Sequence, residues 1–118
     1  MSGLLSRLFG RAPAARSTWI DAPGLRSRLG AVLLIDVREP AEFTAPPGHL
    51  PGAVNIPLQT LSGRVAEIAG QARPVVLVCK TDRRSAKAAE ILLQAGLADV
   101  TVLRGGTDGW HEQGLPLE

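Results

Sequence analysis

The sequence of 118 residues has few of the side chains that mark several common protein classes. Its single cysteine, Cys79, excludes a disulfide framework and argues against a cysteine-based metal cluster. Two histidines without ligand-like spacing give no reason to expect a metal, and no phosphate-binding glycine motif points to a cofactor. A lone thiol fits a reducing setting, so we expect a cytoplasmic protein without a metal or cofactor.

Aromatic residues and long apolar runs are also scarce. Aromatic side chains make up 3% of the chain and tyrosine is absent, whereas 45% of the residues are hydrophobic. The core must therefore be aliphatic. No apolar run approaches the ~20 residues that a membrane-spanning helix needs, so we do not expect a membrane protein. The length suits one domain with one core.

The positive charge is concentrated at the start of the chain. Residues 1–17 hold three arginines and no acid, whereas the remaining residues hold one more acidic than basic side chain. The net charge of +2 therefore reflects the first residues and gives no support for a nucleic-acid partner. We predict a flexible basic leader over residues 1–17 and a single domain over residues 18–118.

Apolar runs and helical patterns alternate along that domain. The runs predict strands over residues 18–20, 31–35, 53–56, 74–79 and 100–103. Helical spacing predicts helices over residues 22–29, 40–43 and 58–69, another after Arg84, and a last one over residues 107–113. The alternation predicts an α/β fold, with a five-stranded parallel sheet and helices on both of its faces.

Cys79 lies at the junction between a predicted strand and a predicted helix. It ends the apolar run 74–79, and a helical pattern follows after a few polar residues. Ligands bind at the carboxyl ends of strands in such sheets, and the free N–H groups at a helix N-terminus favour a thiolate. Asp82 removes some of the positive charge nearby. Three cationic side chains follow the cysteine within five residues: Lys80, Arg83 and Arg84.

The spacing after Cys79 distinguishes between two kinds of thiol chemistry. Thiol-dependent phosphatases need an arginine six positions after the cysteine, so that one loop surrounds a whole phosphate. In this chain that position is Ser85, and the arginines stand four and five positions after the cysteine. The smaller loop suits a single sulfur held on the cysteine as an anionic persulfide.

Four ordered blocks of sequence stand out: Ile35–Pro40, Gly48–Pro57, Val78–Cys79 with Arg84–Ser85, and Leu103–Gly106 with Trp110 and Gly114–Pro116. Together they resemble the single-domain rhodaneses, a family similar to thiosulfate sulfurtransferases. The resemblance covers residues 18–118 and implies a rhodanese-like fold. It also implies that Cys79 takes the outer sulfur of a donor and holds it as a persulfide. Asp82 departs from the pattern, because many family members have glycine there.

Cys79 is the predicted catalytic residue, and two groups of residues around it are predicted to bind substrate or to support the site. The predicted substrate-binding loop consists of Lys80, Thr81, Asp82, Arg83, Arg84 and Ser85. The predicted supporting residues are Asp36, Arg38, Glu39, His49 and Arg104. We expect Asp36, Arg38 and Glu39 to form a charged cluster that holds loops in place at the carboxyl edge of the sheet, because buried charges need partners. We expect His49 to serve as a structural hydrogen-bonding residue.

The expected function is sulfur transfer from a small anionic donor, such as thiosulfate, to an outside thiol, a protein thiol or cyanide. The acceptor must come from outside, since Cys79 has no second thiol to resolve it. Two alternatives stay open. One is a cysteine-dependent phosphatase or arsenate reductase of related fold, and the other is a non-enzymatic sulfur-carrier or redox-sensing docking module. The sequence leaves the oligomeric state and the physiological partners open.

Overall fold

The computed structural model describes residues 17–118, so all but the last residue of the predicted leader 1–17 lies outside the described residues. The strands are β1 (Thr18–Ile20), β2 (Leu33–Asp36), β3 (Val54–Asn55), β4 (Val75–Val78) and β5 (Val100–Leu103). The α-helices are α1 (Ala22–Arg26), α2 (Pro40–Thr44), α3 (Val65–Gly70), α4 (Arg83–Gln94) and α5 (Gly106–Glu112). Two 3₁₀ helices complete the chain, η1 (Leu29–Ala31) and η2 (Leu58–Arg64).

The five strands form one parallel sheet in the order β1-β5-β4-β2-β3. The predicted five-stranded parallel sheet is therefore confirmed. Strand β4 occupies the middle position, and its last residue Val78 pairs in register with Asp36 of β2. The two residues that follow these strands, Cys79 and Val37, thus emerge together at the carboxyl edge of the sheet.

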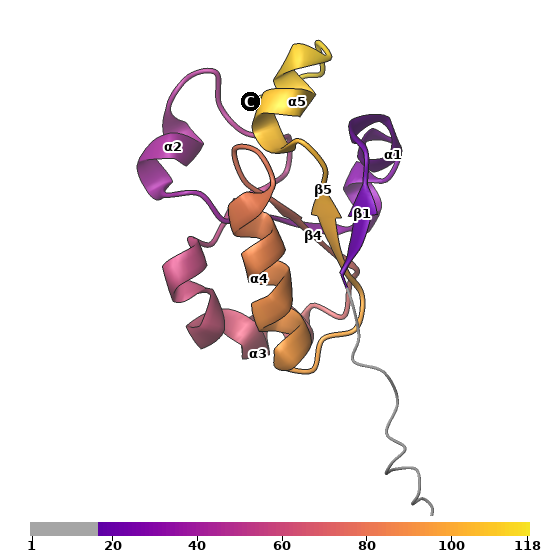
Figure 1. Ribbon diagram of the computed structural model, residues 1–118, viewed down its shortest axis with the longest axis vertical. Coiled ribbons are helices and arrows are strands. Elements are labelled where there is room, and N and C mark those ends of the chain that lie inside the picture. The colour runs from indigo at the N-terminus through magenta and orange to yellow at the C-terminus, as the bar shows by residue number, and fades with distance from the viewer. Residues whose placement is uncertain (1–16) are drawn as a thin grey trace, which may run out of the picture.

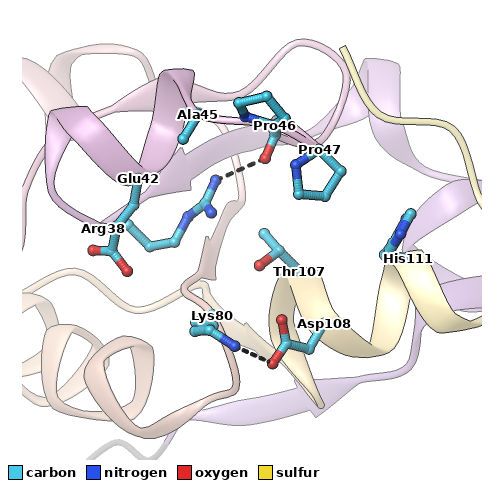
Figure 2. Close-up of a pocket in the computed structure, with 10 residues that line it drawn as sticks. Arg38, Glu42, Ala45, Pro46, Pro47, Lys80, Thr107, Asp108 and His111 are labelled. Carbon is cyan, nitrogen blue, oxygen red and sulfur yellow. Dashed lines mark hydrogen bonds and ion pairs between the residues drawn. The ribbon is translucent and has the colours of Figure 1, made fainter.

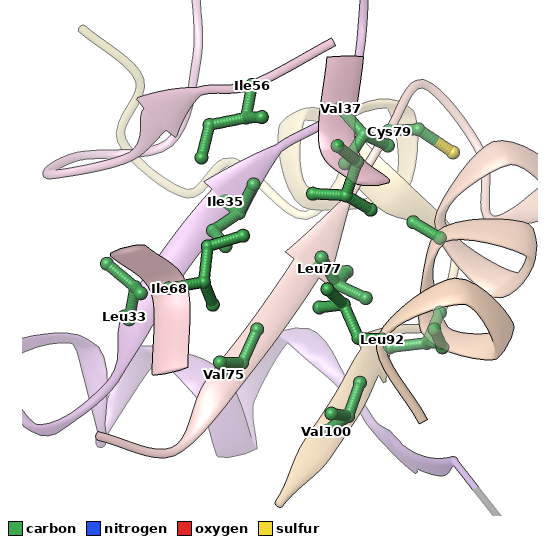
Figure 3. Packing of buried hydrophobic residues seen from close by; sticks show 14 residues of the cluster. Leu33, Ile35, Val37, Ile56, Ile68, Val75, Leu77, Cys79, Leu92 and Val100 are labelled. Carbon is green, nitrogen blue, oxygen red and sulfur yellow. The ribbon is translucent and has the colours of Figure 1, made fainter. Parts of the chain in front are cut away.

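Alternating side chains of the strands divide the core into two layers. On one face, residues such as Ile35 and Leu77 pack with Leu92 of α4 and Ile68 of α3 (Figures 1 and 3). The opposite face packs against α1 and α5, where the buried Trp110 donates its indole N–H to the Pro116 carbonyl at 2.7 Å. Helices on both faces agree with the prediction, and the near absence of aromatic residues makes this core aliphatic.

Two predicted helices differ from the structure in their extent. The helix expected over 22–29 ends at Arg26, and the separate 3₁₀ helix η1 covers Leu29–Ala31. The helix expected over 58–69 divides into η2 and α3. In both cases the apolar spacing suits the tighter 3₁₀ turn as well as the α-helical one over a few residues.

No helix in the described part of the chain is long and apolar enough to cross a membrane.

Candidate active site around Cys79

Cys79 lies directly after the central strand and is almost completely buried. Its residue surface is 1% exposed, and the side chain borders the apolar layer on the α4 side of the sheet. Figure 3 shows its sulfur pointing away from the other side chains of that layer. The thiol thus faces the turn that leads into α4, as the strand-to-helix junction predicts.

Ser85 in the first turn of α4 contacts the sulfur twice. Its backbone N–H donates to Cys79 Sγ at 3.4 Å, and its Oγ lies 3.4 Å from the same sulfur. The hydroxyl also lies 3.2 Å from the Asp82 carbonyl and donates to it. Since a hydroxyl has one hydrogen, it either donates to that carbonyl or turns to donate to a thiolate. The contact gives the sulfur two donors when it is ionised.

The loop between Cys79 and Ser85 presents unpaired backbone donors. Within the described residues, the N–H groups of residues 80–84 donate to no protein acceptor. Successive backbone N–H groups without a protein acceptor are the kind of donors that can hold an anion. This arrangement suits a negatively charged sulfur on Cys79.

Helix α5 holds this loop from the other side through backbone hydrogen bonds. The Thr107 N–H donates to the Cys79 carbonyl at 2.8 Å, and the Asp108 N–H donates to the Lys80 carbonyl at 3.0 Å. Gly106 makes the approach feasible, because a Cβ there would collide with the carbonyl oxygens of Cys79 and Thr81. Its positive φ of 59° also favours glycine.

Asp82 accepts a backbone hydrogen bond and forms no ion pair within residues 17–118. Its Oδ2 accepts the Gly105 N–H at 3.0 Å, and no ion pair in the described part of the chain includes it. The carboxylate therefore ties the loop from Cys79 to Ser85, the candidate reactive loop, to the turn between β5 and α5. This role accounts for an acidic residue at a position where the resemblance leads one to expect glycine.

Two of the three cations after Cys79 are paired with acids from distant segments. Lys80 Nζ lies 2.7 Å from Asp108 Oδ2, and Arg84 forms two hydrogen bonds of 2.7 and 3.0 Å to the carboxylate of Glu42. Arg83 is exposed and has no salt-bridge partner within residues 17–118. The field around the loop is therefore less positive than the sequence alone suggests.

The pair between Arg84 and Glu42 perturbs both groups. The side-chain hydrogen bond from Arg84 is the largest cause that lowers the pKa of Glu42 from 4.5 to about 2. The same bond raises the pKa of Arg84 above its ordinary value. Glu42 also accepts the Glu39 backbone N–H at 3.0 Å, so one carboxylate connects the start of α2 to the start of α4.

Asp36 and Arg38 form a buried ion pair beneath the site. Arg38 Nη2 lies 2.8 Å from Asp36 Oδ2 and also donates to the Gly48 carbonyl at 3.1 Å. Asn55 donates to the backbone carbonyls of both residues, at 3.0 and 2.9 Å. The group fixes the loop that follows β2 against the segment around Gly48.

The other predicted supporting residues have partners of their own, away from the Asp36–Arg38 pair. Glu39 is exposed at the start of α2. His49 Nδ1 is 2.9 Å from the Phe43 carbonyl, and its ring stacks on the Phe43 ring with centroids 3.7 Å apart. Arg104 places its guanidinium 4.8 Å from the ring centroid of Trp19 on the edge strand β1. No contact in the described residues joins these three side chains to Cys79 or Ser85.

A cavity of about 560 Å³ opens beside the reactive loop. Figure 2 shows Arg38, Glu42 and the Ala45–Pro47 segment on one side, with Lys80 and the α5 side chains on the other. Its wall consists of Arg38, Glu42, Ala45, Pro46, Pro47, Gly48, Lys80, Thr107, Asp108 and His111. Lys80 directly follows the cysteine and the Thr107 N–H binds the Cys79 carbonyl, so the cavity adjoins the sulfur-bearing loop.

Glu42 and Asp108 also belong to this site, although the sequence did not single them out. Gly106 is part of the block Leu103–Gly106 that carries the resemblance, and two adjacent glycines directly after a strand mark a backbone turn. Glu42 and Asp108 carried no such signal, since their partners lie 42 and 28 positions away. Within residues 17–118, no three histidine, cysteine, aspartate or glutamate side chains lie together as a metal site requires.

Comparison with known proteins agrees with this geometry. Residues 21–113 match the rhodanese-like domain family. The chain is 39% identical to a protein named sulfurtransferase from Allochromatium vinosum, over 83% of this chain and 92% of that one. It is 35% identical to the thiosulfate sulfurtransferase GlpE of Shewanella oneidensis, over 70% of this chain and 78% of that one.

A solved structure extends the similarity to the fold. A rhodanese-related protein from Thermoplasma volcanium superposes with a TM-score of 0.74 at 34% identity, covering 86% of this chain and 95% of that one. Other matched proteins are longer, and the chain spans 27% of one curated relative and 16% of one solved structure. The chain with its buried Cys79 and short donor-lined loop belongs to the rhodanese-like domain family.

Proposed function

We propose that the protein is a sulfurtransferase that carries sulfane sulfur on Cys79, taking it from a small anionic donor and passing it to a thiol or to cyanide. The observation that carries the proposal is the surroundings of Cys79 Sγ, with Ser85 donating at 3.4 Å and five unpaired N–H groups in the loop. The relative from Shewanella oneidensis is named a thiosulfate sulfurtransferase, which supports thiosulfate as a donor.

The reaction has two steps. The Cys79 thiolate attacks the outer sulfur of thiosulfate, the sulfur–sulfur bond of the donor breaks, and sulfite leaves with the electron pair. Cys79 then carries a persulfide, whose terminal negative charge the loop N–H groups stabilise. An external thiolate attacks that terminal sulfur, forms a new persulfide and restores the Cys79 thiolate.

The loop geometry favours this reaction over phosphoryl transfer. The position six residues after the cysteine, where a phosphatase needs arginine, is Ser85, and its side chain contacts the sulfur. Arg84, at the preceding position, is paired with Glu42. A tetrahedral phosphate would therefore lack the bidentate arginine that such enzymes use to hold it.

Intact-mass spectrometry tests the proposal. Freshly reduced protein mixed with thiosulfate should gain about 32 Da, the mass of one sulfur, by the covalent route. Cyanide or excess thiol should remove the added mass, and the Cys79→Ser variant should never acquire it. An unchanged mass in the wild-type protein, together with turnover of p-nitrophenyl phosphate, would instead identify the phosphatase alternative. A stable persulfide without steady-state turnover would identify the sulfur-carrier alternative.

A further inference from the structure

Acidic and basic side chains are equally numerous on the wall of the cavity beside the reactive loop. Besides His111, the charged residues on the wall are two cations, Arg38 and Lys80, and two acids, Glu42 and Asp108. Figure 2 shows the two acids on opposite sides of the cavity. Since the repulsion from a carboxylate scales with the charge of the approaching group, a dianion meets twice the repulsion that a monoanion meets. The pairing of these acids therefore decides which anions the cavity attracts.

Asp108 and Glu42 differ in where their cationic partners lie. Lys80 stands on the wall together with Asp108, with 2.7 Å from Nζ to Oδ2, so a ligand meets this pair as a neutral unit. Glu42 also stands on the wall, whereas its partner Arg84 is not among the described residues that line the cavity. A ligand in the cavity therefore meets the negative member of the second pair first.

The positive charge of Arg84 acts on Cys79 as well as on Glu42. The side-chain hydrogen bond to Glu42 is the largest cause that raises the pKa of Arg84, and the charge of Cys79 acts in the same direction. Glu42 binds the guanidinium through two hydrogen bonds of 2.7 and 3.0 Å. The carboxylate thus offsets a positive charge that would otherwise favour an anion close to the reactive sulfur.

Arg38 does not replace the positive charge that Glu42 offsets. Its guanidinium donates three side-chain hydrogen bonds to the buried carboxylate of Asp36. The charge of Arg38 also lowers the pKa of Glu42, although the hydrogen bond from Arg84 is the largest cause. The two arginines and two acids of this group sum to zero charge, so removing the charge of Glu42 leaves one net positive charge.

From this arrangement, and resting on the proposed sulfur transfer, we infer that Glu42 makes the site select sulfur donors with one negative charge over dianions. The favoured class is a singly charged organic donor of the type R–SO₂–S⁻, whose organic group fits the cavity of about 560 Å³. The Cys79 thiolate attacks the outer sulfur, the sulfur–sulfur bond breaks, and the sulfinate R–SO₂⁻ leaves with the electron pair. Glu42 is thus a specificity-determining residue for the first step.

Two donors of different charge test the inference. Thiosulfate is a dianion and methanethiosulfonate is a monoanion, and either one adds one sulfur to Cys79. Glu42→Gln should raise the rate constant of persulfide loading, followed by mass, about tenfold for thiosulfate and about threefold for methanethiosulfonate at low salt. The ratio of the two rate constants therefore rises about threefold. Differences in donor reactivity and in the thiolate fraction cancel when this ratio is compared between proteins.

Two further variants separate charge from structure. Glu67 forms the same kind of two-bond pair with Arg64, and neither residue lines the cavity. Glu67→Gln should therefore leave the ratio unchanged. The double variant Glu42→Gln/Arg84→Met restores zero charge without the pair, and its ratio should return to the wild-type value. An unchanged ratio in Glu42→Gln, or a double variant that keeps the altered ratio, would overturn the inference.

Unreactive anions separate this inference from the proposed function. Sulfate and methanesulfonate have similar sizes and different charges, and neither donates sulfur. Titrated into ¹⁵N-labelled protein at constant ionic strength, sulfate should gain affinity in Glu42→Gln about threefold more than methanesulfonate does. If neither donor loads sulfur, the proposed function fails, and the binding ratio decides the inference, which an unchanged ratio or absent binding overturns. If both donors load sulfur with an unchanged ratio, charge selection by Glu42 fails alone.

Discussion

Arg84 and Glu42 connect the first turn of α4 to α2 through two parallel hydrogen bonds of 2.7 and 3.0 Å. The residues lie 42 positions apart in the chain, and the pair joins the reactive loop to a wall of the adjoining cavity. Because a carboxylate holds the guanidinium, a donor that binds Arg84 would have to compete with Glu42. The contact between α4 and α2 depends on whether the Glu42 carboxylate is ionised.

Glu42→Gln should remove a contribution to stability that depends on pH. The pKa of Glu42 is lowered to about 2, so the ionised carboxylate stabilises the fold above pH 4.5, and this contribution is lost as the pH falls toward 2. Since both side chains are about one-third exposed, solvent screening limits the contribution to about 1 kcal/mol. Urea unfolding of both proteins at pH 7 and near pH 2 measures it. The difference should be present at pH 7 and should vanish near pH 2.

Glu90→Gln is the matched control for that comparison. Glu90 pairs with Lys87 at 3.8 Å on an exposed part of α4. Its replacement should change stability little at either pH. A difference between wild type and Glu42→Gln that persists at low pH would show that packing, and not the charge, is responsible.

Arg83→Ala should weaken the use of thiosulfate more than other charge changes on α4. Arg83 is exposed next to the loop and has no acidic partner in the described residues, so its full charge acts on an approaching anion. We expect a rise in KM corresponding to about 0.5–1 kcal/mol, larger at low salt than at high salt. Lys87→Ala removes the same charge farther along α4 and should leave KM unchanged. Equal KM values for the two variants would contradict a role for Arg83 in donor attraction.

Gly106→Ala should unfold or strongly destabilise the protein. The added Cβ collides with the carbonyl oxygens of Cys79 and Thr81, and the backbone has a φ of 59°. The two effects together should cost about 3 kcal/mol or more. Gly109→Ala in the same helix is the control, because its Cβ meets nothing closer than 3.9 Å. Thermal denaturation should show that Gly109→Ala is as stable as wild type or more stable, because alanine favours a helix.

Two substitutions of Asp82 should separate its charge from its hydrogen bond. Asparagine keeps an oxygen that accepts the Gly105 N–H but removes a negative charge from the loop that follows Cys79. We therefore expect Asp82→Asn to retain stability and to lower the KM for thiosulfate modestly, most clearly at low salt. Asp82→Ala also loses the hydrogen bond and should be less stable by about 1 kcal/mol. If Asp82→Asn used thiosulfate no better than wild type, the carboxylate would act only as a structural acceptor.

The sequence predicted those parts of the site that depend on neighbouring residues. The apolar run before Cys79 and the helical pattern after it placed the thiol at a strand-to-helix junction, and Ser85 was included in the predicted substrate-binding loop. Apolar periodicity also determined the number and direction of the strands. These features follow from local backbone preferences, which a single sequence displays.

The partners of the charged side chains could not be predicted in the same way. The cations Lys80 and Arg84 stand out in the sequence, but Asp108 and Glu42 meet them only because α5 and α2 converge on the same sheet edge. That convergence depends on the strand order β1-β5-β4-β2-β3, which no local pattern encodes. A site that seems strongly cationic in sequence is therefore largely charge-paired in the structure.

The hydrogen bonds from α5 to the carbonyls of Cys79 and Lys80 have a consequence for the direction of the neighbouring amides. In a trans peptide the C=O of one residue and the N–H of the next point in opposite directions. Fixing these two carbonyls toward α5 therefore turns the N–H groups of Lys80 and Thr81 away from it. Helix α5 thus helps to set the direction in which these two N–H groups point. A substitution that moves α5 would therefore change the donors near Cys79 through the backbone, without any side-chain contact to the sulfur.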